Sequence, residues 1–442
     1  FAAALSYVIY FANQNRKSGK LSGKNIFYRG LKMNENEICR YRQGTKTNLV
    51  QQTYARLTDY YCYATDVRVI QLTTGGEKDF VRQYRQFLIE SPDLKVVVVL
   101  LKHQKYLTIL LKQLDNYLVD TMLVDDEADQ ASLNTFELYS RKNDVEKMSV
   151  IYSLISSLIS FQNVKIVQYT ATPQALFLLD GDNDLCPEKY FVQMPPTAYF
   201  GISDLLDEDI NYVNLVNGEN PNLEILIIDF IQRVSNLIGS GYDENISMMI
   251  HTHWNTKKLN EDYLGVNKIV KKVIAEPSLF NLHAEFDENE KQFLDWFDAN
   301  MLIHKVFGDN NEMSWNKQVN ILVGGNMLER GYTIPGLVSS VLTRNSKSKS
   351  NADSLQQRCR FLGYREPIKE QLVVHLTREI HEDFIDYAES QYLLLAELGE
   401  SGKISDFSKR FFMDNLNPTR SNVLPKSLKR SLANKPLILS DF

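Results

Sequence analysis

Cysteine is scarce in this sequence and shows no pairing pattern. Four cysteines occur among 442 residues, at Cys39, Cys62, Cys186 and Cys359, and no two of them form a Cys-x-x-Cys pair. This spacing argues against a disulfide framework and against a structural zinc site. No apolar run approaches the roughly 18 residues that a membrane-spanning helix needs. We therefore expect free thiols in a reducing cytoplasm and no membrane partner.

Excess positive charge is also missing. The 49 Lys and Arg residues are outnumbered by 55 Asp and Glu residues, which gives a net charge of −6. A protein that grips DNA over its whole surface would be basic, so any nucleic-acid contact is expected in a local groove. The chain of 442 residues is too long for one compact core and is typical of two or three domains.

A phosphate-binding loop of the form Gly-x-x-x-x-Gly-Lys-Ser/Thr is absent as well. Ser18-Gly19-Lys20 and Ser22-Gly23-Lys24 lack the hydroxyl residue that must follow the lysine. Residues 1–14 are apolar, without a basic leader or a cleavage site, which predicts a buried helix rather than a signal peptide. Because such a helix should directly follow a phosphate-binding loop, we expect that loop just before Phe1.

Short apolar runs alternate with helical patterns along the chain. Each run ends in a polar cluster, as expected of parallel strands whose carboxyl ends carry a ligand site. The run 96–101 is continuous and β-branched, which predicts a strand buried on both faces. Helical stretches lie between the runs, at 106–117 and 146–161 for example. The other expected strands are 121–124, 164–169, 248–250, 320–323 and 371–375.

This alternation predicts an α/β fold with two parallel-sheet domains and helical insertions. We expect a first domain over residues 1–204 and a helical linker over 205–245. A second domain is expected over 246–400, with a helical insertion from about 255 to 315. Residues 401–442 are basic in patches and are expected to form a solvated tail, with DNA contact as the alternative.

The run Asp125-Asp126-Glu127-Ala128-Asp129, here called the acidic segment, directly follows an apolar strand. Hydrolysis of a phosphoanhydride needs magnesium to neutralise developing charge and a carboxylate to orient the attacking water. We assign Asp126 and Glu127 to the metal, Asp126 holding it through water, and Glu127 also to activating the nucleophile. Crowded carboxylates repel one another unless a cation lies among them. The alternative is an acidic surface turn.

Thr170 and Thr172 follow their own strand, one strand–helix unit after the acidic segment. Their hydroxyls can bond the carboxylates of the acidic segment and couple hydrolysis to domain movement. A Thr-Pro turn by itself is common, so the position in the chain carries this prediction.

A glycine-containing segment, 323–337, is expected to contact the nucleotide through Gly325, Glu329, Arg330 and Gly331. Glycines after a strand let the backbone approach a ligand closely. The sequence Arg-Gly followed by Ile-Pro also matches the fifth helicase motif. The alternative is a glycine-rich turn with an exposed arginine.

A second segment, 355–365, adds Gln357 as a nucleotide contact and Arg360 and Arg365 as candidate arginine fingers. A guanidinium group stays charged and binds phosphate oxygens in a fork, which suits the charge of the transition state. Spacing alone leaves open which arginine is the finger. The alternative is a basic helix face.

Three weaker signals remain. Thr45 and Lys46 stand at a strand-to-helix junction that predicts either a nucleic-acid contact or a plain helix cap. Lys102 ends a strand and is a further candidate nucleic-acid contact. His251 and His253 are too few for a metal site, so a role at the strand end is expected.

The runs 125–132, 324–337, 357–365 and 417–424 together resemble the Z1 domain family, which is described as an endonuclease domain. The resemblance spans about residues 44–424. It implies two RecA-like domains, the core of helicase superfamily two, with ATP and Mg²⁺ in the cleft between them. It carries hydrolysis over to Asp126 and Glu127, and phosphate contact and coupling to Arg330, Arg360 and Arg365.

The resemblance also implies duplex DNA as a partner in prokaryotic restriction or anti-phage systems, beside a nuclease or a second ATPase. Three functions stay open: an ATP-driven DNA translocase, an endonuclease with a helicase-like sensor core, and a non-catalytic scaffold. The sequence shows no PD-(D/E)xK pair, which weakens the second. The presence of Asp126, Glu127 and both candidate fingers weakens the third.

Overall fold

The computed structural model divides the chain into two units. The N-terminal unit comprises Val8–Gln193, Leu395–Phe411 and Pro418–Phe442, and the C-terminal unit comprises Phe1–Tyr7, Met194–Leu394 and Phe412–Asn417. The structure describes residues 8–13, 45–73, 75–90, 95–116, 120–129, 132–136, 139–140, 143, 147–193, 199–207, 211–218, 220–276, 288–307, 314–325, 328, 334–344, 349–398, 401–406, 416–417 and 419–423.

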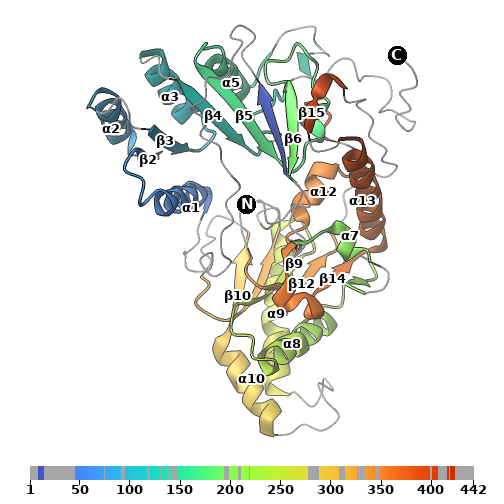
Figure 1. Ribbon diagram of the computed structural model, residues 1–442. Coiled ribbons are helices and arrows are strands. Elements are labelled where there is room, and N and C mark those ends of the chain that lie inside the picture. The colour runs from blue at the N-terminus through green and yellow to red at the C-terminus, as the bar shows by residue number, and fades with distance from the viewer. Residues whose placement is uncertain are drawn as a thin grey trace, which may run out of the picture. The chain divides into compact units, whose positions relative to one another are not determined.

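The larger sheet of the N-terminal unit has five strands in the order β15-β6-β1-β5-β4 (Figure 1). β4 and β5 are parallel, whereas β1 runs antiparallel to both β5 and β6, and β15 runs antiparallel to β6. The sheet is therefore mixed. Its strands are β1 (Val8–Asn13), β4 (Thr121–Asp126), β5 (Val164–Thr170), β6 (Lys189–Gln193) and β15 (Ser401–Lys403).

One face of this sheet is covered by α3 (Gln104–Asn116) and α5 (Val150–Ile159), which pack against each other while α5 packs on β5. Along β5, alternate residues from Val164 to Thr170 are buried, as expected for a strand with one covered face. The short helix α6 (Gln174–Phe177) follows β5 and is buried throughout.

A separate two-stranded parallel sheet in the same unit joins β2 (Val67–Leu72) to β3 (Lys95–Leu100). α1 (Thr45–Tyr60) precedes it and α2 (Glu77–Glu90) connects its strands. β3 was expected to be buried on both faces, but Val99 is its one buried residue. Among the described strands β3 pairs only with β2, so it lies at a sheet edge and its residues are covered less completely.

The C-terminal unit contains a six-stranded sheet in the order β10-β11-β9-β12-β14-β8, and all neighbouring strands are parallel (Figure 1). Every residue of the central strands β9, β11 and β12 is buried, which explains why most of their residues are apolar. The polar residues Ser247, Asn320, Ser339 and Ser340 are buried with them. The strands are β8 (Val213–Leu215), β9 (Ile246–His251), β10 (Met301–Val306), β11 (Val319–Gly324), β12 (Leu337–Leu342) and β14 (Val373–Leu376).

Two hydrophobic cores lie on opposite faces of this sheet. Met248 and Ile250 of β9 belong to one core, and Met249 between them belongs to the other. The first core is completed by α8 (Leu223–Gly239), α9 (Thr256–Ala275) and α10 (Glu288–Asn300). The second is completed by α7 (Ile202–Leu205), α12 (Ala352–Arg358) and α13 (Arg378–Leu398). A small antiparallel pair, β7 (Tyr199–Phe200) with β13 (Gly363–Tyr364), and a 3₁₀ helix, Glu366–Gln371, complete the unit.

The predicted α/β fold class with parallel sheets is confirmed, although β1 and β15 make the larger N-terminal sheet mixed. The strands β2, β6 and β12 were not predicted, and four other strands stand where the prediction had placed a helix or a tail. A strand, β1, stands where residues 1–14 were expected to form a helix. An apolar run of this length suits either element, and pairing with β5 and β6 decides between them. Likewise β8 and β10 lie within stretches predicted as helical insertions. β15 occupies part of the expected solvated tail because β6 offers it an edge to pair with.

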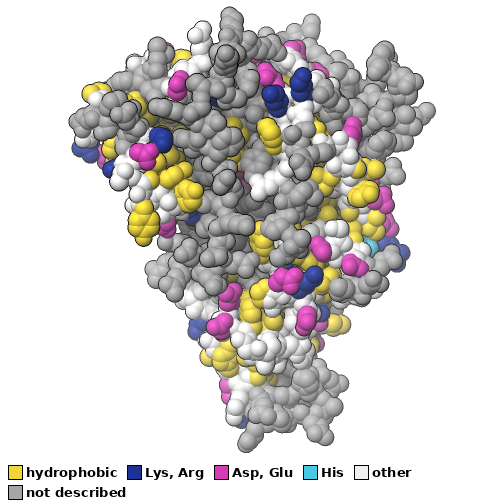
Figure 2. Space-filling model, viewed as in Figure 1, with side chains coloured by type: hydrophobic (Ala, Val, Ile, Leu, Met, Phe, Trp, Pro, Cys, Tyr) yellow, Lys and Arg dark blue, Asp and Glu magenta, His cyan; other side chains and the backbone are white. Residues whose placement is uncertain are grey.

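Three further findings concern the helices, cysteines and charged side chains of the described part of the chain. None of its helices combines the length and apolar character that crossing a membrane requires. Cys62, Cys186 and Cys359 are free thiols. Acidic and basic side chains are interspersed among the described residues on the face seen in Figure 2.

Asp383 on α13 makes the stability of the C-terminal unit depend on pH. Burial raises the pKa of its carboxyl to about 6 from an ordinary value near 3.8, against the effects of a hydrogen bond with Ser350 and the charge of Arg358. The native state therefore holds this proton more tightly than the unfolded chain does. The contribution of Asp383 to the free energy of unfolding is therefore fully present below pH 3.8 and is lost as the pH rises through about 6.

Replacing Asp383 with Asn should therefore stabilise the protein at pH 8 by about 1–2 kcal/mol, since one pKa unit corresponds to 1.36 kcal/mol and the side chain is partly exposed. The gain should vanish near pH 4. Thermal denaturation at both pH values measures it, with Glu389→Gln, an exposed acid on α13 that does not affect the pKa of Asp383, as control. An equal gain at both pH values would show that titration of Asp383 is not the cause.

Candidate functional site

The acidic segment occupies the carboxyl end of β4. Asp125 is buried, whereas the side chains of Asp126 and Glu127 are exposed. Glu127 has a positive φ of 49°, a conformation that is uncommon for a residue other than glycine. Its N–H donates to Oδ1 of Asp126 at 3.0 Å, and the N–H of Ala128 donates to the carbonyl of Tyr169 at 3.1 Å. The chain thus turns sharply after β4 and is held against β5.

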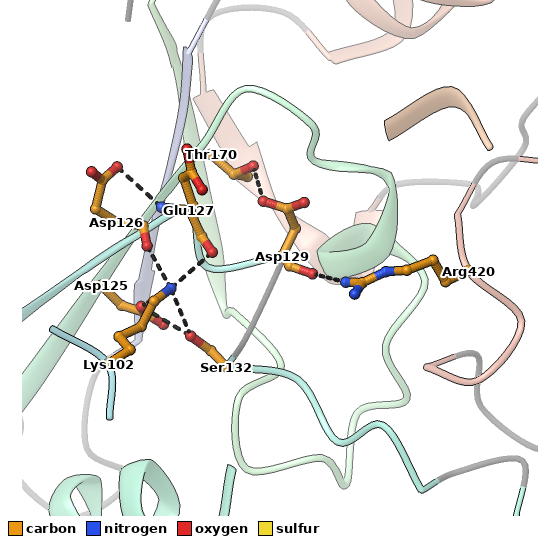
Figure 3. Close-up of polar contacts among 8 residues, drawn as sticks. All are labelled: Lys102, Asp125, Asp126, Glu127, Asp129, Ser132, Thr170 and Arg420. Carbon is orange, nitrogen blue, oxygen red and sulfur yellow. Dashed lines mark hydrogen bonds and ion pairs between the residues drawn. The ribbon is translucent and has the colours of Figure 1, made fainter. Parts of the chain in front are cut away.

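Lys102, which follows β3, holds this turn from one side (Figure 3). Its ammonium group lies 3.0 Å from Oδ1 of Asp125 and donates to the carbonyl oxygens of Asp126 at 2.5 Å and Glu127 at 2.9 Å. Ser132 also contacts the ammonium, at 3.2 Å, and donates to Oδ1 of Asp125 at 3.0 Å. The sequence predicted a nucleic-acid contact for Lys102. That prediction stays untested, and the structure gives Lys102 a role inside the acidic cluster.

Thr170 and Thr172 both donate to one buried carboxylate. Thr170 lies 2.6 Å from Oδ1 of Asp129, and Thr172 lies 2.7 Å from Oδ2. The N–H of Thr172 in turn donates to the hydroxyl of Thr170 at 2.9 Å. The sequence suggested that these hydroxyls bond to the acidic segment. In the structure they bond to Asp129, and not to Asp126 or Glu127. Their role in coupling hydrolysis to movement stays a prediction.

The exposed pair, Asp126 and Glu127, has the donor set that a magnesium–nucleotide complex needs. No group of three or more His, Cys, Asp or Glu residues is arranged to hold a metal in the described part of the chain. Magnesium at nucleotide sites uses one or two carboxylates, because water and phosphate fill its other positions. Desolvation by the surrounding protein raises the pKa of Asp126, although its side chain is partly exposed, and the charge of Lys102 opposes this shift. The pair therefore fits Mg²⁺.

The two candidate arginine fingers in the C-terminal unit stand in different surroundings. Nε of Arg365 donates to the carbonyl of Phe361 at 2.9 Å, and its Nη2 donates to that of Arg360 at 2.7 Å. Burial lowers its pKa to about 10. Arg360 is half-buried, and its Nε donates to the carbonyl of Leu328 at 3.3 Å. Main-chain carbonyls thus engage both guanidinium groups, and which arginine is the finger stays a prediction.

The expected nucleotide contacts are described in part. Gln357 is a half-buried residue of α12. Gly325 follows β11, and a Cβ there would lie 3.0 Å from a methyl group of Leu259. Packing against Leu259 therefore gives a second reason, besides a nucleotide contact, for a residue without a side chain at Gly325. The other expected contacts, Glu329, Arg330 and Gly331, lie outside the described residues.

Thr45 and Lys46 are the first residues of α1, which agrees with the predicted start of a helix. Their side chains lie outside the described set, so the prediction of a nucleic-acid contact stays untested.

His251 at the end of β9 is surrounded by positive charge. Nε2 of His251 lies 3.5 Å from Nη1 of Arg344. Burial, followed by the charges of Arg358 and Arg344, lowers the pKa of His251 to about 3. Two neighbouring guanidinium groups disfavour a metal cation, so the expected strand-end role is the better interpretation of His251 and His253.

Two contacts of the acidic segment were not foreseen from the sequence. One is Ser132, whose hydroxyl bonds Asp125 as described above. The other is Arg420, whose Nη2 donates to the carbonyl of Asp129 at 2.6 Å (Figure 3). Arg420 is separated from Asp129 by 291 positions, and no spacing rule links them. The one sequence feature that could have pointed to Arg420 was its place in the run 417–424, which is part of the family resemblance.

Comparisons with known proteins were made for sequence and for structure. No curated protein matches the sequence. Among solved structures, the chain is similar to S. cerevisiae Dbp5 bound to RNA and ADP BeF3, with 14% identity, a TM-score of 0.33 and coverage of 77% of this chain and 72% of that one. A single-residue variant of Dbp5, bound to the same ligands, gives 12% identity, the same coverage and a TM-score of 0.34.

The DEAD-box helicase Mss116 bound to ssRNA and UDP-BeF is similar at 12% identity and a TM-score of 0.34, over 75% of this chain and 58% of that one. These TM-scores are too low to assign equivalent residues. The sequence of residues 219–414, which include most of the C-terminal unit, matches the Z1 domain family.

Proposed function

We propose that this chain hydrolyses ATP with Mg²⁺ at the acidic segment and uses the energy to move along DNA. One observation carries the proposal: the exposed carboxylates of Asp126 and Glu127 stand between two buried ones, each fixed by its own partners. Lys102 and Ser132 hold Asp125, while Thr170 and Thr172 hold Asp129. Such preorganisation is what charge stabilisation in phosphoryl transfer requires.

Each residue has a defined part in the proposed reaction. Asp126 would hold Mg²⁺, and Glu127 would orient the water that attacks the terminal phosphate. Bound Mg²⁺ supplies neutralisation of the phosphate charge. Lys102 holds the carbonyls of Asp126 and Glu127 and so fixes the backbone that carries both carboxylates. Arg360 or Arg365 is proposed as the arginine finger, with Gln357 and Gly325 as further contacts to the nucleotide.

The biological setting is a further part of the proposal. The match of residues 219–414 to the Z1 domain family supports a motor subunit of a prokaryotic restriction or anti-phage defence system. Duplex DNA is the proposed track, and a nuclease or second ATPase is the proposed partner. The endonuclease alternative gains no support from the described residues, in which no three-residue metal cluster is found.

ATP hydrolysis by the full-length protein, measured with and without duplex DNA, tests this function. We expect Mg²⁺-dependent turnover that DNA increases by about tenfold or more, equivalent to about 1.4 kcal/mol of barrier. Single-stranded DNA and RNA of equal length identify the preferred track. Metal-dependent DNA cleavage without ATP turnover would support the endonuclease alternative. Absence of both activities would leave the scaffold.

A further inference from the structure

Arg420 approaches the acidic segment on the side away from Lys102 (Figure 3). Its neighbour Thr419 is 1% exposed, and the N–H of Val423, which is also buried, donates to the carbonyl of Arg420 at 3.2 Å. The backbone around Arg420 is therefore fixed by burial on one side and by a turn on the other. From this position its guanidinium reaches the carbonyl of Asp129 at 2.6 Å.

Two positively charged side chains donate hydrogen bonds to the backbone of the turn that carries Glu127. Lys102 binds the carbonyls of Asp126 and Glu127, and Arg420 binds that of Asp129. Between them, the N–H of Ala128 donates to β5. Hydrogen bonds from charged donors are the stronger kind. An unfavourable conformation such as the positive φ of Glu127 persists only where its surroundings over-determine it.

We propose that Arg420 is a positioning residue for Glu127. It acts through the main chain of Asp129 and, together with Lys102, keeps the turn after β4 in the conformation that directs the Glu127 carboxylate outward. This assignment rests on the proposed hydrolytic function of Glu127. Without Arg420, the segment after Ala128 loses its charged donor, and the turn can relax toward a more common backbone conformation. A catalytic group displaced by about 1 Å can cost about 100-fold in rate.

Three variants of the full-length protein test the proposal: Arg420→Ala, Arg420→Lys and Arg82→Ala. Arg82 serves as the matched control because its side chain is 74% exposed on α2 and pairs with Asp79 three residues away, far along the chain from the acidic segment. We expect Arg420→Ala to lower kcat by about 10- to 100-fold and to change KM for ATP by less than about threefold. Arg420→Lys should recover part of kcat, since an ammonium group can also donate to a carbonyl.

Hydrogen exchange measures the turn without reference to turnover. In Arg420→Ala, amides between Asp126 and Ser132 should exchange at least about tenfold faster, while those of β9 and β11 in the C-terminal unit should be unchanged. Exchange at the wild-type rate together with wild-type kcat would overturn the proposal. Equal loss of kcat in both Arg420 variants with unchanged exchange would also overturn it. If the wild-type protein hydrolyses no ATP but Arg420→Ala still exchanges faster, the link between Arg420 and the turn is supported and the proposed function is wrong.

Discussion

Replacement of Glu127 by Gln is expected to lower kcat for ATP by at least about 100-fold, the lower end of what a positioned general base contributes. Glutamine keeps the size of the side chain and removes the charge that orients the attacking water. The side chain is exposed, and surface substitutions change stability by about 0.5 kcal/mol or less, so the variant should fold and melt as the wild type does. Steady-state turnover with saturating Mg²⁺ and DNA measures the effect.

Binding distinguishes loss of chemistry from loss of the site. Glu127→Gln should bind ATP within about threefold of the wild-type Kd, because the backbone turn and Asp126 are unaltered. Glu188→Gln is the matched control, since Glu188 is also an exposed acid in the N-terminal unit and lies outside the acidic segment. It should keep full activity. Retention of most turnover in Glu127→Gln would remove this residue, and with it the proposed hydrolytic centre, from consideration.

Replacement of Lys102 by Met should destabilise the N-terminal unit by about 3 kcal/mol. The side chain of Asp125 is only 3% exposed, and that of its partner Lys102 is 24% exposed. Removing one member of a buried ion pair leaves an uncompensated charge, which costs about 3–5 kcal/mol. The lower end applies because water reaches part of the lysine and Ser132 still donates to the carboxylate. Urea denaturation measures the change.

A second substitution shows whether the stranded carboxylate is the cause. Adding Asp125→Asn to Lys102→Met should restore about 1 kcal/mol or more, since the buried charge is then gone. The control is Lys95→Met, because Lys95 and Asp66 form an ion pair whose side chains are 48% and 56% exposed. Exposed pairs contribute about 0–1 kcal/mol. Equal losses at Lys102 and Lys95 would show that Lys102 is not the electrostatic anchor of the turn.

Periodicity predicted the central strands β9 and β11, which are buried on both faces, but it missed the equally buried β12, whose apolar sequence is interrupted by Ser339 and Ser340. Every residue of β9 and β11 is buried, so their sequences are mostly apolar, and the runs 248–250 and 321–323 in them predict strands. The edge strands β8 and β15 and the inner strand β1 were missed or misassigned. β8 and β15 have only three residues each, too short for a period, and β1 has an apolar sequence that suits helix and strand alike.

The candidate site divides in the same way. Asp126 and Glu127 were identified because carboxylates at the end of an apolar strand form a local pattern. Thr170 and Thr172 were identified because they follow the strand that pairs with it. Which carboxylate they bond, and what Lys102 contacts, depend on side-chain directions that spacing does not specify.

By itself the sequence determined the α/β class, the strands β4, β5, β9 and β11 and the identity of the acidic segment, since all of these follow from short-range hydrophobic patterning. Only the tertiary structure decided which acids are buried and which are exposed, and that Arg420 reaches Asp129 across 291 positions. The physical reason is that burial and long-range hydrogen bonds depend on how elements pack. Packing brings together residues whose separation along the chain follows no period.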